Sequence, residues 1–143
     1  MFVRIGREGD LVLTVSNRDI KNALQVFCRD KDVKVRGLVV ILTSDEVQTR
    51  YNNLFLGHNY NTDVITQQYD SPLGVLVEMY INGCSTFMEN NEHPLRYLLR
   101  MVFHGLLHVT GYNDKTDNER IKMREEENRL LQLFHVEHKP QWV

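Results

Sequence analysis

Two histidines and a carboxylate stand at a spacing typical of metal ligands within the segment HGLLHVTGYND, residues 104–114. His104 and His108 are four residues apart, so on a helix both side chains lie on one face and can reach the same ion. Gly111 allows the chain to leave the helix and turn back, and Asp114 follows three residues later. The pattern H-x3-H-x2-G-x2-D therefore predicts that His104, His108 and Asp114 bind a divalent ion, with Zn²⁺ expected, and leave a fourth position open.

Each of these assignments has an alternative. Two histidines four residues apart also occur on helices that bind no metal, and only the glycine and the carboxylate favour a site here. As third ligand we prefer Asp114 to Asp117, which falls in a predicted helix cap, and to His135, which falls at the far end of the last helix. The other four histidines are expected to be solvated; they are His58, His93, His135 and His138.

The histidine pair lies on a predicted helix that begins at Pro94, a residue suited to the first helical position. This helix is apolar on two sides, and its charge is confined to a narrow strip through Arg96 and Arg100. Such a pattern is typical of a central, buried helix. Thr116 and Glu119 then form a capping box for a last helix over about residues 117–134.

Before that helix the sequence alternates between strands and helices, which predicts an α/β domain with parallel strands. Ser16 and Asp19 provide a capping signal for the first helix, and Ser44 provides one for the second. Apolar periodicity gives the remaining bounds. The predicted strands span residues 11–15, 33–43, 63–69 and 74–81, and the predicted helices span residues 17–30 and 45–56.

The composition limits the class of protein. The chain has 143 residues, 42% of them hydrophobic and 25% charged, which fits a single globular domain over residues 1–143. The net charge of −2 argues against binding nucleic acid through bulk charge. Cys28 and Cys84 cannot build a disulfide framework or a zinc site made of cysteines alone. The sequence has neither the apolar region of a signal peptide nor an apolar run long enough to cross a membrane, so we expect a cytoplasmic protein.

A metallopeptidase is the first enzyme class to consider for a pair of histidines on a helix. Those enzymes carry H-E-x-x-H, in which the glutamate acts as general base. Here Gly105 stands in place of that glutamate. Metal-dependent peptide hydrolysis by this route is therefore disfavoured.

The segment HGLLHVTGY resembles the signature H-G-x-L-H-x-x-G-Y-D-H of the YbeY family of endoribonucleases, which are rRNA maturation factors. A second stretch, Thr62 to Ile65, is similar to the family segment T-D-V-L-S-F, and Asn52 matches an upstream asparagine. The resemblance covers about residues 40–125. It implies a mixed, mainly parallel sheet of about four strands above a buried metal-binding helix. It also implies single-strand-specific RNA cleavage in rRNA maturation and ribosome quality control, with the rRNA precursor and the small ribosomal subunit as partners.

The chain departs from this family at three places. Asp114 replaces the third histidine ligand, Leu56 stands where the family has an arginine before T-D-V, and Val75 replaces the aspartate of a G-D-I strand start. A carboxylate also binds zinc, but Leu56 cannot neutralise charge on a phosphoryl group. Arg50 is either a substitute for that arginine or an ordinary solvated side chain. No catalytic residue is therefore assigned beyond the metal ligands.

Two further expectations follow from these departures. The alternative to an enzyme is a ribosome-associated factor that binds RNA or protein, uses its metal as a structural clip and has little catalytic activity. In either case RNA binding needs cations near the site, and Lys34 and Arg36 on the second predicted strand are the preferred phosphate contacts.

Overall fold

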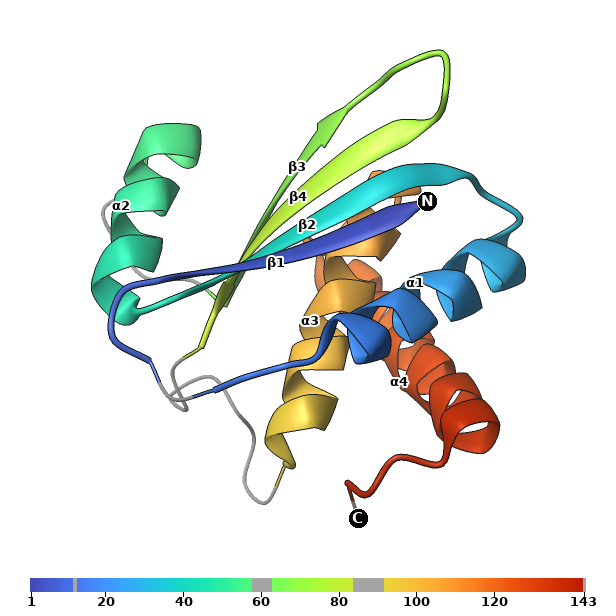
Figure 1. The fold of residues 1–143 in the computed structure, drawn as a ribbon. Helices are drawn as coiled ribbons and strands as arrows, with labels where there is room; N and C mark the ends of the chain where they lie inside the picture. The colour runs from blue at the N-terminus through green and yellow to red at the C-terminus, as the bar shows by residue number, and fades with distance from the viewer. Residues whose placement is uncertain (12, 58–62, 84–91, 143) are drawn as a thin grey trace.

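The computed structural model of the chain describes residues 1–11, 13–57, 63–83 and 92–142. Strands and helices alternate through the first half, and two long helices follow (Figure 1). In chain order the elements are β1 (Phe2–Glu8), α1 (Asn17–Lys31), β2 (Val35–Thr43), α2 (Asp45–Leu56), β3 (Val64–Tyr69), β4 (Val75–Asn82), α3 (Pro94–Val109) and α4 (Asp117–His138).

The four strands form one mixed sheet in the order β1-β2-β4-β3. β1 pairs with β2 and β2 with β4 in parallel, whereas β3 runs antiparallel to β4 at the edge. α1, α3 and α4 cover one face of the sheet, and α2 covers one end of the other face (Figure 1). The predicted α/β fold, with its mainly parallel four-stranded sheet, is confirmed.

Local sequence signals account for the helix starts. The side chains of Ser16, Ser44 and Thr116 each accept a hydrogen bond from a backbone N–H in the first turn of α1, α2 and α4. At Thr116 the predicted capping box is complete, because the Glu119 carboxylate also accepts from the Thr116 backbone N–H. Together these bonds satisfy donors that a helix leaves unpaired at its N-terminus.

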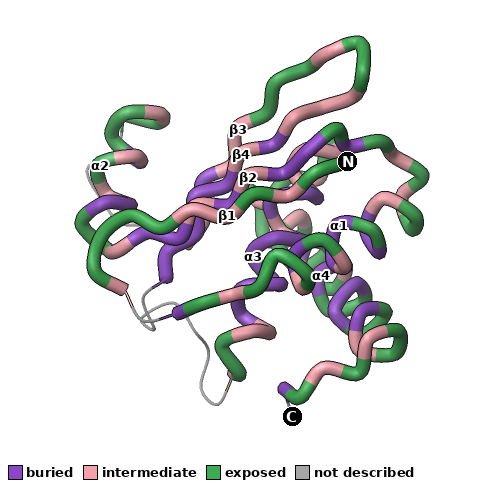
Figure 2. The backbone as a smooth tube through the Cα atoms, viewed as in Figure 1, coloured by how far each residue is buried: buried purple, intermediate pink, exposed green. Residues whose placement is uncertain are grey.

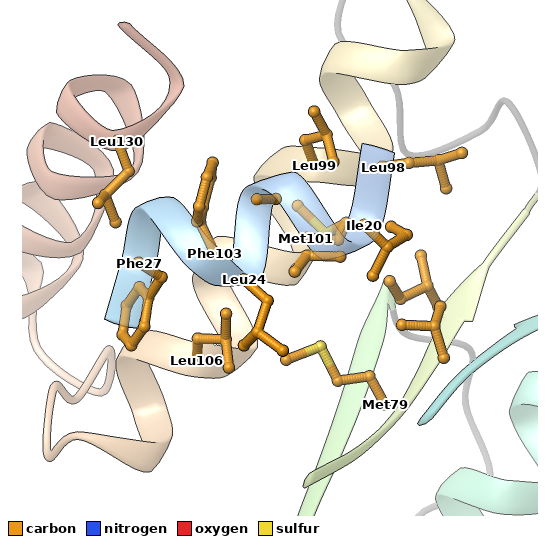
Figure 3. Close-up of a cluster of buried hydrophobic side chains, with 14 of the residues drawn as sticks. Ile20, Leu24, Phe27, Met79, Leu98, Leu99, Met101, Phe103, Leu106 and Leu130 are labelled. Atoms are coloured by element: carbon orange, nitrogen blue, oxygen red, sulfur yellow. The ribbon is translucent and has the colours of Figure 1, made fainter. Parts of the chain in front are cut away.

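α3 is the central helix, as its two apolar faces predicted. Ten consecutive or near-consecutive positions between Tyr97 and Leu107 are buried, and burial is concentrated where α3 meets the sheet and the other two helices (Figure 2). Leu98 and Leu106 pack with Leu24 of α1, Met79 of β4 and Leu130 of α4 in one hydrophobic cluster (Figure 3). This packing fixes the helix that carries the histidine pair.

The structure corrects the sequence prediction at the N-terminus. The first strand is Phe2–Glu8. Residues 11 and 13–15 belong to no strand, and Val12 lies outside the described residues. The Arg7 guanidinium donates to the carbonyl oxygens of Leu11 (2.9 Å) and Leu13 (2.5 Å). Two carbonyls of the expected strand are thus bound by a side chain rather than by a neighbouring strand.

The last helix is also longer than predicted, because it continues to His138 instead of ending near residue 134. In the part of the chain that the structure describes, no helix has the length and apolar character needed to cross a lipid bilayer.

Candidate metal centre

His104, His108 and Asp114 come together at the C-terminal end of α3, where one potential ligand atom of each residue lies within 4.8 Å of the others. The two Nε2 atoms are 3.1 Å apart, and each lies 3.3 Å from Oδ2 of Asp114. Ligand atoms that bind zinc at about 2.0–2.1 Å in a tetrahedron are themselves roughly 3.3–3.4 Å apart. The triangle of these three atoms therefore has the dimensions of one face of a zinc tetrahedron.

Hydrogen bonds on the far side of each ring determine where the imidazole protons lie. Nδ1 of His104 is 2.7 Å from Oε2 of Glu127, and Nδ1 of His108 is 3.0 Å from the carbonyl oxygen of Tyr112. A carboxylate and a carbonyl can only accept, so each Nδ1 is the donor and each Nε2 of a neutral ring carries a lone pair. One ring is thus supported by a carboxylate and the other by a backbone carbonyl.

The centre is thus a cluster of acceptors that needs a cation. Two nitrogen lone pairs and a carboxylate oxygen face one another at 3.1–3.3 Å, an arrangement that is repulsive unless a positive charge lies between them. Burial lowers the pKa of His104, but the hydrogen bond and charge of Glu127, with the charges of Asp63 and Asp114, outweigh it and raise this pKa above its ordinary value. The same negative charges favour a metal cation at Nε2. The donor set therefore fits a divalent metal ion.

Gly105 allows the histidine helix to approach the sheet closely. A Cβ at this position would lie 2.6 Å from Oγ1 of Thr66 on β3 and 2.7 Å from Cε of Met79 on β4. The position faces the sheet, so it has no room for the glutamate of a metallopeptidase helix. The structure supports the sequence argument against that class of enzyme.

The turn after α3 brings Asp114 back to the histidines. Gly111 has a φ of 102°, in the region that glycine favours. On the other side of the turn, Nη1 of Arg120 donates to the carbonyl oxygens of Asp114 (3.2 Å) and Lys115 (3.0 Å). The first turn of α4 therefore holds the main chain at the residue that closes the triangle.

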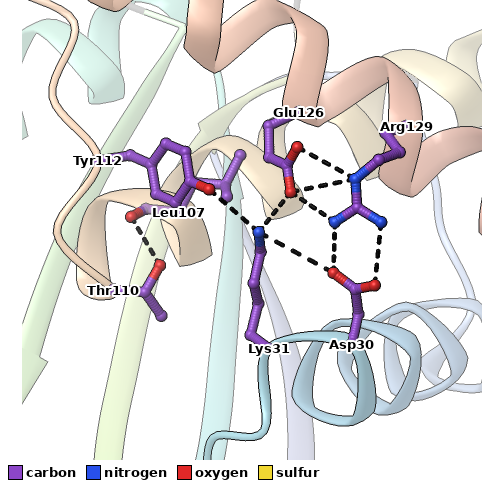
Figure 4. Close-up of polar contacts among 7 residues, drawn as sticks. All are labelled: Asp30, Lys31, Leu107, Thr110, Tyr112, Glu126 and Arg129. Carbon is purple, nitrogen blue, oxygen red and sulfur yellow. Dashed lines mark hydrogen bonds and ion pairs between the residues drawn. The ribbon is translucent and has the colours of Figure 1, made fainter.

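A polar network on the same side of the molecule ties the turn to α1 and α4 (Figure 4). Nζ of Lys31 donates to the hydroxyl of Tyr112 (3.1 Å) and contacts the Glu126 carboxylate. Glu126 also pairs with Arg129, whose guanidinium in turn pairs with Asp30. Tyr112, whose carbonyl accepts from His108, is thus bound to α1 through Lys31, and Lys31 in turn connects it to Glu126 of α4.

The other residues noted in the sequence lie in different places. Asp63, just before β3, is close enough for its charge to act on His104. Leu56 is the last residue of α2 and is half exposed.

Arg50 lines a small hollow with Glu8 and Tyr51. The ring of Tyr51 packs on Tyr80 of β4, and Tyr80 points away from the face of the sheet on which its neighbour Met79 meets α3. Arg50 therefore lies on the opposite face of the sheet from the histidines, which gives no support to a role as substitute for the family arginine.

Lys34 and Arg36 are both exposed. Lys34 lines a cavity of about 410 Å³ together with Val109 and Thr110, the two residues that follow His108, and with Gln68 and Asp70. His93 caps α3, while His135 and His138 contact aromatic rings near the end of α4. Three residues named in the sequence lie outside the described part of the chain: His58, Thr62 and Cys84.

Glu127 is the residue of the centre that sequence reasoning missed. It is 4% exposed and lies on the buried face of α4 between Met123 and Leu130. A glutamate within the apolar row of a helix is itself a signal, because buried carboxylates need a partner.

Comparisons with known proteins identify the family of the chain. The family model described as endoribonuclease YbeY matches residues 11–135. The endoribonuclease YbeY of Chlorobium phaeovibrioides is 31% identical over 122 residues, which cover 80% of each chain. That of Chlorobium phaeobacteroides is 35% identical over 107 residues, or 70% of this chain and 72% of the relative.

A solved structure supports the fold. The solution structure of TM1509 from Thermotoga maritima superimposes with a TM-score of 0.56 over 94% of this chain and 91% of that chain, at 23% sequence identity. With a family match over most of its length and relatives above 30% identity, the chain belongs to the endoribonuclease YbeY family.

Proposed function

We propose that this protein is a metal-dependent endoribonuclease that cleaves single-stranded RNA in rRNA maturation and ribosome quality control. One observation carries the proposal: the convergence of the His104, His108 and Asp114 ligand atoms at 3.1–3.3 Å, with both ring protons on the far side. Family membership supplies the RNA substrate. Such work takes place in the cytoplasm, with the rRNA precursor and the small ribosomal subunit as partners.

The three residues would hold one Zn²⁺ and leave one coordination position toward solvent. An ion held by these residues would polarise a phosphoryl oxygen and would lower the pKa of bound water. The chain itself supplies the orientation: Glu127 and the Tyr112 carbonyl keep each Nδ1 protonated, so both Nε2 atoms would be free to bind the ion. The carboxylates of Asp114 and Glu127 together balance the two charges of the ion, which gives a neutral centre.

The cation that the family places near Leu56 has to come from elsewhere. Lys34 is the residue we assign to phosphate binding, because it lines the same cavity as Val109 and Thr110 beside His108. A lysine there contacts phosphate as a point charge and strengthens RNA binding in a salt-dependent way. Arg36, exposed two residues later, adds to the same local charge.

The test is cleavage of a labelled single-stranded RNA by the purified chain, alongside the same sequence in a duplex. We expect cleavage of the single strand, its loss with EDTA, its recovery on addition of Zn²⁺, and its absence in His108→Ala. Cleavage that persists in EDTA and in His108→Ala would contradict the proposal.

The loss of the family arginine favours a second candidate, an RNA- or protein-binding factor of the ribosome whose metal is a structural clip. Leu56 gives this chain no positive charge at that position. The same experiment separates the two. RNA binding without cleavage, unchanged by EDTA, would support the binding factor. A metal-dependent peptidase stays disfavoured, because Gly105 packs against Thr66 and Met79.

A further inference from the structure

Behind the metal centre lies a buried arginine that the proposed reaction does not use. The sequence placed Arg100 in the narrow charged strip of the central helix, and in the structure this residue is only 2% exposed. It lies on α3 one turn before His104, between Glu92 just ahead of the helix and Glu127 on α4. The side chains of Arg100, Glu92 and Glu127 are each 3–5% exposed.

The contacts of Arg100 reach both carboxylates at once. Its Nε and Nη2 donate to Oε2 of Glu92 at 3.2 and 2.8 Å. Its Nη1 donates to Oδ1 of Asn128 at 3.0 Å and lies 3.5 Å from Oε1 of Glu127. The other oxygen of Glu127, Oε2, accepts from Nδ1 of His104. One carboxylate therefore faces the guanidinium with one oxygen and the imidazole with the other.

We propose that Arg100 is a positioning residue of the metal centre, acting through Glu127 on His104. This inference rests on the proposed metal site. Glu92 and Asn128 fix the planar guanidinium, and the guanidinium attracts one oxygen of Glu127, so the other oxygen stays directed at His104. That hydrogen bond holds the ring in the tautomer and orientation that present Nε2 to the ion.

The two histidines differ in this respect. His108 takes its orientation from a backbone carbonyl, that of Tyr112, which the turn at Gly111 sets in place. His104 depends on a side chain of another helix, and this side chain can rotate. Among the described residues, the other arginine that pairs with Glu127 is Arg124. Its Nη1 lies 4.0 Å from Oε1 of Glu127, and its side chain is 43% exposed. Without Arg100, the Glu127 carboxylate turns toward Arg124 and solvent, and His104 loses its acceptor.

Stability alone gives no reason for this arrangement. Burying charged groups costs desolvation, and well-packed apolar side chains of similar size are often as stabilising as a buried ion pair. A guanidinium does what an apolar residue cannot, because it fixes the direction of a carboxylate through its donor geometry. The position of Arg100 therefore fits a role in aiming Glu127 better than a role in packing.

The test measures the Zn²⁺ affinity of the metal-free chain by competition with a chromophoric chelator. Arg100→Met should weaken this affinity by about tenfold or more, the effect typical of losing an outer partner of a metal ligand. The matched control is Arg96→Met, one turn earlier on α3. Arg96 pairs with Glu92 at 2.9 Å and is one-third exposed, but its ion pair does not include Glu127. We expect less than a twofold change in the control.

A second readout separates positioning from a general loss of stability. In a double-mutant cycle, Glu127→Gln alone should weaken Zn²⁺ binding by about 10–100-fold. Adding Arg100→Met to Glu127→Gln should then cost less than about threefold more, because the path to His104 is already broken. The visible absorption of Co²⁺ bound to each variant reports ligand geometry and should shift in Arg100→Met but not in Arg96→Met.

Specific outcomes would overturn the inference. It fails if Arg100→Met binds Zn²⁺ as the parent does, or if its effect is fully additive with that of Glu127→Gln. If Arg100→Met does not fold without metal, Arg100→Lys takes its place, because lysine keeps the charge but cannot bind Glu92 and Asn128 in the same fork. If the parent chain binds no Zn²⁺, the metal-site proposal fails as well. If the parent and Arg96→Met bind equally and Arg100→Lys does too, only this inference is lost.

Discussion

Nζ of Lys31 lies 3.1 Å from the hydroxyl oxygen of Tyr112 and 5.0 Å from the centre of its ring. Lys31 is the last residue of α1, and Tyr112 supplies the carbonyl that accepts from His108. The end of one helix is thus connected to the turn of the candidate metal centre by a hydrogen bond and a cation–π contact. Glu126 of α4 completes this connection, because it pairs with Lys31.

The first prediction concerns Glu126 and acid stability. Its hydrogen bond with Arg129, helped by Lys31 and opposed by burial, lowers the Glu126 pKa to about 2. In the unfolded chain the pKa returns to about 4.5, so the carboxylate stabilises the fold above that pH and ceases to do so as the pH falls toward 2. We expect Glu126→Gln to lose about 1–2 kcal/mol of unfolding free energy at pH 7, after allowance for solvent screening.

Urea unfolding followed between pH 7 and pH 2 checks this prediction. The difference between Glu126→Gln and the parent should shrink below pH 4.5 and vanish near pH 2. The control is Glu125→Gln at the neighbouring exposed position, which should change stability by less than about 0.5 kcal/mol. A difference that stays constant over the whole pH range would contradict the assigned role of Glu126.

The second prediction concerns the ligand histidines. His108→Ala should abolish stoichiometric Zn²⁺ binding, because two remaining ligands cannot hold the ion at a tetrahedral site. Metal content after dialysis, measured by elemental mass spectrometry, gives the answer. His135→Ala is the control, since His135 lies eight residues beyond Glu127 on α4, or about 12 Å along the helix. One equivalent of zinc in His108→Ala would show that the ligand assignment is wrong.

The third prediction concerns the carboxylate ligand. Asp114→Ala should weaken metal binding strongly, whereas Asp114→His should retain the metal. A neutral imidazole leaves the centre more positive than a carboxylate does, which should lower the pKa of metal-bound water further. The pH optimum of RNA cleavage should therefore move down in Asp114→His. A pH–rate profile of both proteins tests this, with Asp117→Asn as the control at an exposed carboxylate. Unchanged metal affinity in Asp114→Ala would exclude Asp114 as a ligand.

The fourth prediction concerns the approach of α3 to the sheet. Gly105→Ala should destabilise the fold by about 1–3 kcal/mol, because the new methyl group would meet Thr66 and Met79 at less than 3 Å. Thermal unfolding measures the change. Met79→Ala in the same background should recover part of the loss by making space at the contact. A gain in stability from Gly105→Ala alone would mean that the helix sits less closely on the sheet than described.

Local signals predicted most of the elements, and contacts between distant residues explain what they missed. Capping residues and apolar periodicity gave α1, α2 and α3 almost to the residue. β1 was missed because it has no fully buried residue and carries charged residues, and the more apolar residues 11–15 looked more like a strand. That segment is bound instead by the Arg7 guanidinium, a contact that no local pattern reveals.

The same distinction applies to the metal centre. Sequence spacing was enough to predict the three ligands as one group, because His104, His108 and Asp114 lie within eleven residues of each other. Glu127 and Arg100 were not assigned, because their roles follow from the packing of α4 against α3. That packing brings Glu127 to His104 across 23 residues of sequence.

The Glu127 carboxylate and the Tyr112 carbonyl, which accept from the two histidine rings, differ in how far they constrain the residue at their own position. A main-chain carbonyl is present whatever residue occupies position 112, so substitutions there keep the hydrogen bond as long as the turn is preserved. At position 127 the acceptor is the side chain itself, and few residue types can replace it in a buried place. Evolution can therefore vary the support of one histidine while it must conserve the support of the other.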